Sequence, residues 1–189
     1  MDELVAYADK ASEPLSYFHI APFSIHRVEL AAIFHEFGID NVTLESFTRP
    51  GPVQALAAIE AGTLDLLVVT SPYVVPLLES GAAKALTVIH QQRTPVAPNA
   101  PTLLEQGITT MPYGSWSAIF VPAGTSDEDA NRMFEAIRFA VADPDVVKQI
   151  NDLGMEVDLN ESPEEFISFL KSEAKRLSIA VSKYGLRND

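Results

Sequence analysis

Cysteine is absent from the 189 residues, which excludes disulfides, thiolate metal sites and cysteine nucleophiles. Long apolar runs are absent too, and none approaches the roughly 20 residues that a membrane-spanning helix requires. The first residues, Met1-Asp2-Glu3, are acidic and polar, whereas a secretory signal has a basic start and an apolar middle. We therefore identify no membrane span and no secretory signal in this sequence.

Positive charge is scarce: 13 Lys and Arg stand against 26 Asp and Glu, for a net charge of −13. Nucleic acids and anionic membrane surfaces repel such a protein, so we expect neither as a partner. An anionic ligand would have to be held by local hydrogen-bond donors and helix dipoles, because the overall field opposes it.

Helix and strand patterns alternate over residues 13–90, which predicts a β-α-β-α-β-α-β order. The strands are expected at 15–20, 42–47, 64–69 and 84–89, and helices of this length between them predict parallel pairing. A connector with Pro95, Pro98 and Pro101 follows, and Thr102 with Glu105 fits a capping box.

A second unit begins after Gly114, with strands expected at 117–121 and 155–159. Its three helices have clear start signals at Thr125-Ser126, Asp143-Pro144 and Ser162-Pro163. Two strands cannot cover three amphipathic helices, so part of the sheet must be missing from this chain or come from a partner.

Seven short motifs occur in an order and at spacings typical of one family. They are Leu4 to Tyr7; Ala61-Gly62-Thr63-Leu64-Asp65; Pro72 with Gly81; Arg93-Thr94-Pro95 followed by Pro98, Pro101-Thr102, Glu105 and Gly107; Ser115-Trp116 followed by Pro122-Ala123-Gly124-Thr125; Ala142-Asp143-Pro144 with Leu153-Gly154; and Ser162-Pro163-Glu164-Glu165-Phe166. On these motifs the chain resembles the substrate-binding proteins of tripartite tricarboxylate transporters, the Bug or TctC-like family, over about residues 3–187.

The resemblance implies an α/β fold of the periplasmic-binding-protein type (type II, Venus flytrap), with two lobes around a cleft. Residues 1–12 would form a connecting helix, 13–113 the complete second lobe, and 114–189 the C-terminal part of the first lobe. Family members have roughly a further hundred residues upstream, on the scale of a small domain, which hold a signal peptide and the first strands of lobe one. Their absence here would explain the shortage of strands.

The resemblance also implies a function: a periplasmic protein that captures a small organic (di)carboxylate and delivers it to membrane transporter subunits. The mechanism would be cleft closure about hinges near residues 12–16 and 112–116. Neither catalysis nor a cofactor is expected.

Ligand carboxylates in this family sit at helix N-termini, where free N–H groups favour an anion. The corresponding loop here is 18–24, and its candidate ligand-binding residues, with the following helix, are His19, Ala21, Phe23, Ser24 and Arg27. The family's loop is rich in Gly and Ser, whereas this one is bulky and contains Pro22. A larger or aromatic carboxylate, a loss of binding, or simply a packed apolar loop are the alternatives.

Five further residues are candidates for ligand contact. Arg49 and Gly51 form a strand-to-helix turn, where the guanidinium either binds a carboxylate or lies in solvent. Thr70 and Ser71 end a buried strand, where they either face the ligand or cap the next helix. Trp116 either lines the cleft or belongs to the core.

Other functions have less support. His19, His26 and His35 do not share one metal-ligating face, and no phosphate loop, dinucleotide motif or serine elbow occurs. A truncated family member acting as a homodimeric interaction module remains an alternative, since faces such as Phe134/Ile137 and Phe166/Phe169 lack a sheet. A regulator's sensing domain is a third, although no helix-turn-helix or basic segment is present.

Overall fold

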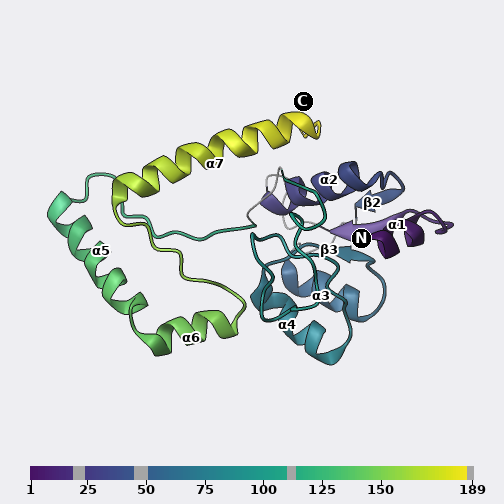
Figure 1. Cartoon of the computed structure of the whole chain (residues 1–189), viewed down its shortest axis with the longest axis horizontal. Helices are drawn as coiled ribbons and strands as arrows, with labels where there is room; N and C mark the ends of the chain where they lie inside the picture. Colours follow the sequence, from purple (N-terminus) through teal and green to yellow (C-terminus); the bar gives the residue numbers. More distant parts are fainter. Residues whose placement is uncertain (19–23, 45–50, 110–113, 187–189) are drawn as a thin grey trace.

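The computed structural model describes residues 1–18, 24–44, 51–109 and 114–186. We call residues 1–109 the N-terminal α/β region and residues 114–186 the C-terminal region (Figure 1). The elements of the N-terminal α/β region are α1 (Asp2–Ala8), β1 (Leu15–Phe18), α2 (Ile25–Phe37), β2 (Val42–Leu44), α3 (Pro52–Glu60), β3 (Leu66–Leu67) and α4 (Ser71–Ser80). Those of the C-terminal region are α5 (Asp127–Val141), α6 (Pro144–Asp152) and α7 (Pro163–Lys183).

The sheet is parallel, as predicted, and its strand order is β2-β1-β3. Leu15 of β1 pairs with Val42 of β2, and Tyr17 pairs with Leu66 of β3. The carboxylate of Asp65 accepts hydrogen bonds from the backbone N–H of Ser16 at 2.8 Å and from its hydroxyl at 2.7 Å. This side chain therefore fixes the entry of β3 against β1.

Three predicted strands do not form among the described residues. In place of a strand at 84–89 there is one isolated parallel bridge between Val88 and Thr102. Residues 117–121 and 155–159 have no strand hydrogen bonds to other described residues. A strand exists only when a neighbour pairs with its backbone, and the described residues of the C-terminal region supply no such neighbour.

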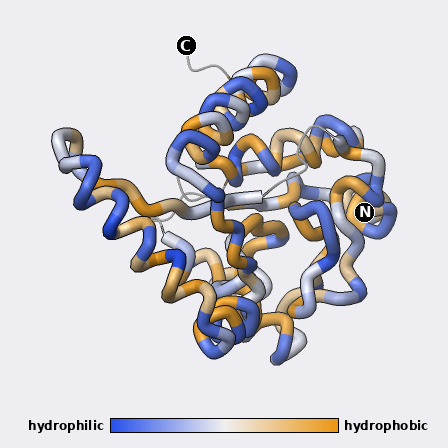
Figure 2. The backbone as a smooth tube through the Cα atoms, turned by 60° about the vertical axis from the view of Figure 1, so that its left-hand side comes forward, coloured by the Kyte–Doolittle hydropathy of each residue, from blue (hydrophilic) through white to orange (hydrophobic). Residues whose placement is uncertain are grey.

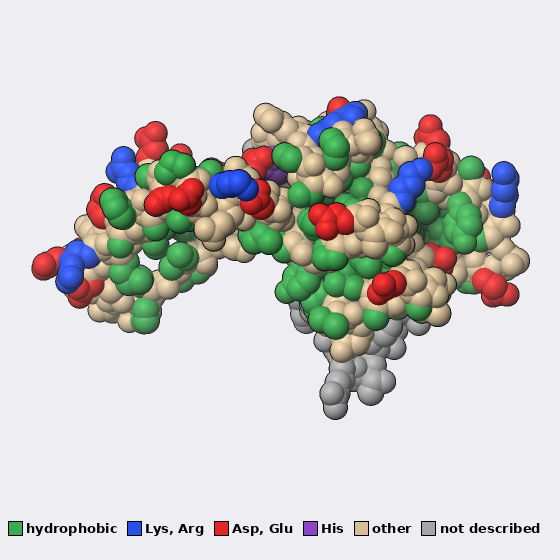
Figure 3. Space-filling model, turned by 90° about the horizontal axis from the view of Figure 1, so that it is seen from below, with side chains coloured by type: hydrophobic (Ala, Val, Ile, Leu, Met, Phe, Trp, Pro, Cys, Tyr) green, Lys and Arg blue, Asp and Glu red, His purple; other side chains and the backbone are tan. Residues whose placement is uncertain are grey.

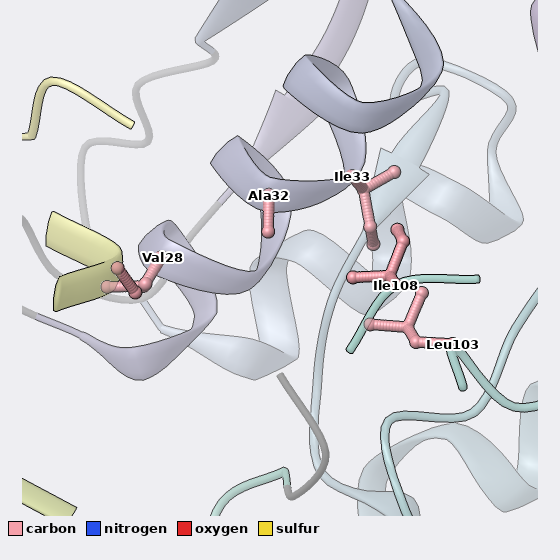
Figure 4. Close-up of a cluster of buried hydrophobic side chains, with 6 residues drawn as sticks. Val28, Ala32, Ile33, Leu103 and Ile108 are labelled. Atoms are coloured by element: carbon pink, nitrogen blue, oxygen red, sulfur yellow. The ribbon is translucent and has the colours of Figure 1, made fainter. Parts of the chain in front are cut away.

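Helix α2 lies at the centre of the core. Its Val28, Ala32 and Ile33 pack with Leu103, Ile108 and Ala180 in one buried cluster (Figure 4). Leu103 and Ala32 have no exposed surface. The predicted boundaries of this helix are confirmed, since Ser24 is its N-cap and Gly38, at φ 64°, ends it in the left-handed conformation that glycine adopts easily.

The predicted capping box at Thr102 and the predicted helix starts at Ser126 and Ser162 are also confirmed. Ser126 and Ser162 accept hydrogen bonds from the backbone N–H groups of Asp129 and Glu165. Thr102 and Glu105 bond reciprocally, the Thr102 N–H to the carboxylate at 2.7 Å and the Glu105 N–H to the hydroxyl at 3.1 Å, although only turns follow.

The C-terminal region buries very little. Only Glu173 and Ala180 are buried among its described residues, and neither α5 nor α6 has a buried residue. The sequence predicts an inward apolar face on α5. Its Phe134 and Ile137 are half-buried, whereas Met133, predicted on the same face, is 47% exposed. Hydrophobic side chains accordingly lie on the surface around α5 and α6 (Figure 3), and hydrophilic and hydrophobic residues alternate along α5 and α7 (Figure 2).

The two regions meet where Gly114 lies against the Ile89 carbonyl group, and at two further places. Near the end of α7, Ala180 and Val181 pack into the α2 core, while the Tyr184 hydroxyl donates to the Glu36 carboxylate at 3.1 Å and Lys183 pairs with the same carboxylate. The turn after α6 contacts the start of α4. None of the helices in the described ranges is both long enough and apolar enough to cross a bilayer.

Candidate functional site

Three helices begin at one edge of the sheet. Each of β1, β2 and β3 is followed by a helix, and the N-caps of α2, α3 and α4 are Ser24, Gly51 and Thr70. Because the strands are parallel, their carboxyl ends and the helix starts that follow them share the same edge. This is the edge at which open α/β sheets bind ligands.

None of these three N-cap residues forms a side-chain capping hydrogen bond with a described residue. In the C-terminal region the contrast is complete: the side chains of Ser126, Asp143 and Ser162 each accept a first-turn N–H. First-turn N–H groups that no side chain caps are left for water or for a ligand. The sheet edge therefore combines three helix starts at which no N-cap side chain accepts a hydrogen bond from a described residue of the first turn.

The acidic residues of the first helical turns are divided between the two regions in the same way. The first turns of α5, α6 and α7 contain Asp or Glu, whereas those of α2, α3 and α4 contain none. Arg27, half-buried, adds a positive charge to the first turn of α2. Acidic residues neutralise the positive end of a helix dipole, and their absence leaves it in place. No first-turn acid therefore offsets the positive dipole ends of α2, α3 and α4, in a chain whose net charge is −13.

Ser24 marks the most specific position of the site. Its Oγ is buried and has no hydrogen-bond partner among the described residues. A buried hydroxyl without a partner costs about 1–3 kcal/mol, so native proteins seldom keep one. An acceptor or donor atom of a ligand at the start of α2 would satisfy it.

Sequence reasoning missed the buried pair behind this helix start. His26 Nδ1 lies 2.7 Å from Glu29 Oε2, and the Glu29 side chain is only 1% exposed. The pair joins the first and second turns of α2 and fixes the orientation of the imidazole. The His-x-x-Glu spacing could have indicated it, since residues three apart share a helix face. No cluster of three or more metal-ligating side chains occurs in the described ranges.

Thr70 and Ser71 open α4 as N-cap and first residue, and both are half-buried. The alternative that Thr70 caps the helix through its hydroxyl is wrong, because its side chain makes no capping bond to a described residue. The Tyr73 N–H bonds instead to the Thr70 carbonyl oxygen at 3.1 Å. The hydroxyl of Thr70 is therefore not committed to the helix.

Trp116 lies in the C-terminal region, where it packs edge-on against Phe169 with ring centroids 5.3 Å apart. Its indole N–H donates to Glu173 Oε2 at 3.2 Å, and the residue is 42% exposed. Its described contacts are thus with α7. A role in lining the cleft stays a prediction.

Four candidates, His19, Ala21, Phe23 and Arg49, lie outside the described residues. Two hollows are lined by described residues: one of about 250 Å³ beside Lys10, Glu13 and Asp65, and one of about 410 Å³ beside Val96 and Asp152. Neither of these two hollows includes Ser24 or Gly51 in its lining.

Comparisons with solved structures identify the fold. A structure from R. palustris with adipate superposes with a TM-score of 0.86 at 22% identity, covering 98% of this chain and 60% of that one. The periplasmic binding protein BugD gives 0.86 at 22% identity, covering 100% and 62%. MatC from Rhodopseudomonas palustris with bound malate gives 0.81 at 26% identity, covering 96% and 61%. The predicted periplasmic-binding-protein fold is confirmed.

Sequence relatives agree with this result. UPF0065 proteins from Pseudomonas sp. (strain P51) and Bordetella pertussis are 28% and 27% identical over 77% and 72% of this chain. The chain spans less than half of either relative, 44% and 42% respectively. Residues 1–186 match the Tripartite tricarboxylate transporter family receptor. The chain therefore belongs to this receptor family, whose members are solute-binding proteins and not enzymes.

Proposed function

We propose that this chain binds a small organic carboxylate or dicarboxylate at the carboxyl edge of its sheet and acts in the periplasm as the receptor of a tripartite transporter. One observation carries the proposal: α2, α3 and α4 begin together without side-chain caps to described residues and without first-turn acids, while α5, α6 and α7 have both. A helix start of that kind is an anion site.

The chemical class of the ligand is supported by the neighbours. Adipate and malate are the ligands in two of the structures that superpose on this chain, and both are dicarboxylates. One carboxylate would accept hydrogen bonds at the start of α2, with Ser24 and Arg27, and the other at the starts of α3 and α4, with Gly51, Thr70 and Ser71. Three helix starts along one edge can receive two separated negative groups.

The remaining candidates would add contacts around this centre. His19, Ala21 and Phe23 belong to the loop before α2, where backbone N–H groups would face the ligand. Arg49 precedes Gly51, and a guanidinium there would bind a carboxylate in bidentate fashion. Trp116 would contact the ligand from the C-terminal region after closure. The bulk of the loop favours a longer or aromatic acid over a compact one.

Thermal unfolding with a panel of ligands tests the proposal. Adipate, malate, an aromatic acid and an amino acid are compared with the neutral diamide of adipate as the matched control. At about 100 times its Kd a ligand stabilises by about 2.7 kcal/mol, which raises Tm measurably. We expect a saturable rise with one acid class and none with the diamide. A flat response to every acid would refute the proposal.

A pair of serine variants separates ligand contact from helix capping. Ser24→Ala removes a buried hydroxyl without a described partner, so we expect an unchanged or raised Tm of the free protein and at least tenfold weaker carboxylate binding. Ser126→Ala removes a hydroxyl that caps α5, so we expect a lower Tm with binding intact. Equal ligand affinity in Ser24→Ala and the wild type would exclude Ser24 from the site.

A homodimeric interaction module is the second candidate function. Ile119, Phe120 and Phe139 are 66%, 66% and 84% exposed, and a second copy of the chain could bury such large apolar side chains. A second copy would cover them, and Phe139→Ser should then shift the association to higher protein concentration. Analytical ultracentrifugation that finds monomers at all concentrations would rule this candidate out.

A further inference from the structure

Gly154 has less free space around its Cα atom than the other glycines that end helices in the described part of this chain. It directly follows the C-cap of α6 and has φ +71°. A Cβ atom built at this position would lie 2.8 Å from the Cβ of Ser71 and 2.9 Å from a methyl carbon of Val96. Ordinary contacts between carbon atoms are 3.5–4.0 Å. The backbone at Gly154 therefore lies directly against the first residue of α4.

The same turn makes a second contact with the N-terminal α/β region. Glu156, two residues after Gly154, places its carboxylate 3.7 Å from His90 Nε2, and this becomes an ion pair when the imidazole is protonated. On the other side of the turn, Asp152 borders the hollow of about 410 Å³ together with Val75, Val96 and their neighbours. Residues 152–156 thus meet α4 and the connector that follows it through several side chains.

This contact lies at the candidate ligand site. Ser71 is the first residue of α4, one of the three uncapped helix starts at the sheet edge. The C-terminal region touches the N-terminal α/β region at α2 through α7, and here through the turn after α6. The two contacted helices follow the central strand β1 and the edge strand β3, respectively. The turn is therefore placed to control how closely the C-terminal region approaches bound ligand.

We propose that Gly154 is a positioning residue of the ligand site: it seats the C-terminal region on Ser71 and Val96 and so sets the closed arrangement in which a carboxylate is held. This inference rests on the proposed carboxylate-binding function. Glycine is required there for two separate reasons, its positive φ and the lack of room for a side chain. The second reason is the one that concerns binding.

Gly185 provides a matched control. It also directly follows a helix C-cap, has φ +66°, and has nothing within 4 Å of a built Cβ. Gly154→Val and Gly185→Val incur a similar backbone cost, but only the first meets a neighbour. We expect Gly154→Val to weaken carboxylate binding at least tenfold and Gly185→Val to weaken it less than twofold, at similar losses of Tm. Equal affinities in the two variants would overturn the assignment.

A crosslink tests the contact without any ligand, and the absence of native cysteine makes it unambiguous. The Cβ atoms of a disulfide lie about 3.5–4.5 Å apart, so Ser71→Cys/Gly154→Cys needs only a small relaxation from 2.8 Å. We expect an intramolecular disulfide on mild oxidation of the ligand-free protein, and none in Ser71→Cys/Gly185→Cys. No crosslink would overturn the proposal. If the crosslink forms but the wild type binds no carboxylate, the proposed function fails and the contact stands.

Discussion

At the scale of single residues, Glu173 has the most connected buried carboxylate of the C-terminal region. Arg176 donates to both of its oxygens, each at 2.7 Å, and Trp116 donates at 3.2 Å. The Glu173 side chain is 5% exposed. The hydrogen bond from Arg176 holds the pKa of this carboxyl below its usual value near 4.5, while burial opposes the shift and Trp116 adds to it.

A carboxyl whose pKa is lower in the folded state stabilises that state above the unfolded pKa, and the contribution is lost as the pH falls through the folded pKa. Glu173→Gln removes the charge, so we expect a loss of about 2 kcal/mol at pH 7 and a shallower loss of stability below pH 4.5. Since Trp116 is the single tryptophan, its fluorescence reports this unfolding directly. If the variant and the wild type lost stability equally steeply as the pH falls, the stabilising role of the Glu173 carboxylate would be contradicted.

Sequence alone could not predict this cluster. Trp116 and Glu173 are 57 positions apart, and neither forms a motif with the other. The sequence predicts either a cleft or a core environment for Trp116. In the structure its ring is 42% exposed and packs against α7. The same applies to Ser24, whose place at a helix start follows from the pattern but whose lack of a described partner requires coordinates.

At the scale of helices and strands, the best predictions were those with a local cause. The starts at Ser126, Asp143 and Ser162 and the stops at Gly38 and Gly81 are confirmed because caps depend on residues within one turn. Strands depend on distant partners. The apolar runs at 84–89, 117–121 and 155–159 predict extended backbone, but no described neighbour pairs with them as a strand.

Two substitutions compare a capped helix start with an uncapped one. Ser162→Ala removes the acceptor of the Glu165 N–H at 3.2 Å, and we expect a loss of about 1 kcal/mol. Thr70→Ala removes no capping bond to a described residue, and we expect a change of only a few tenths of a kcal/mol. Chemical denaturation of each variant measures both. A loss in Thr70→Ala equal to that in Ser162→Ala would mean that Thr70 has a structural partner.

At the scale of the whole molecule, burial is unequal. The three buried clusters are built almost wholly from residues 1–109, and Ala180 is their only buried member in the C-terminal region. The sequence predicted this imbalance from a surplus of helices over strands. It could not say how α7 returns to α2, because Ala180 and Ile33 are far apart in the chain.

Hydrogen exchange should follow the same imbalance. Segments with few buried contacts open at low free energy, so we expect the amides of α5 and α6 to exchange well before those of α2. Mass spectrometry of peptides from 127–152 and 25–37 measures this. Protection that appears in α5 and α6 as protein concentration rises would support a second copy on that surface. Equal protection in dilute solution would contradict the expectation.

The attachment of α7 has a mechanical consequence. The 21 residues of this helix extend about 32 Å, and only the last few are clamped to α2. A rotation of α7 by about 10° about its contact with α2 would therefore move its N-terminal end by about 5 Å. Small repacking around Ala180 would thus swing Phe166 and the tryptophan beside it over a much larger arc.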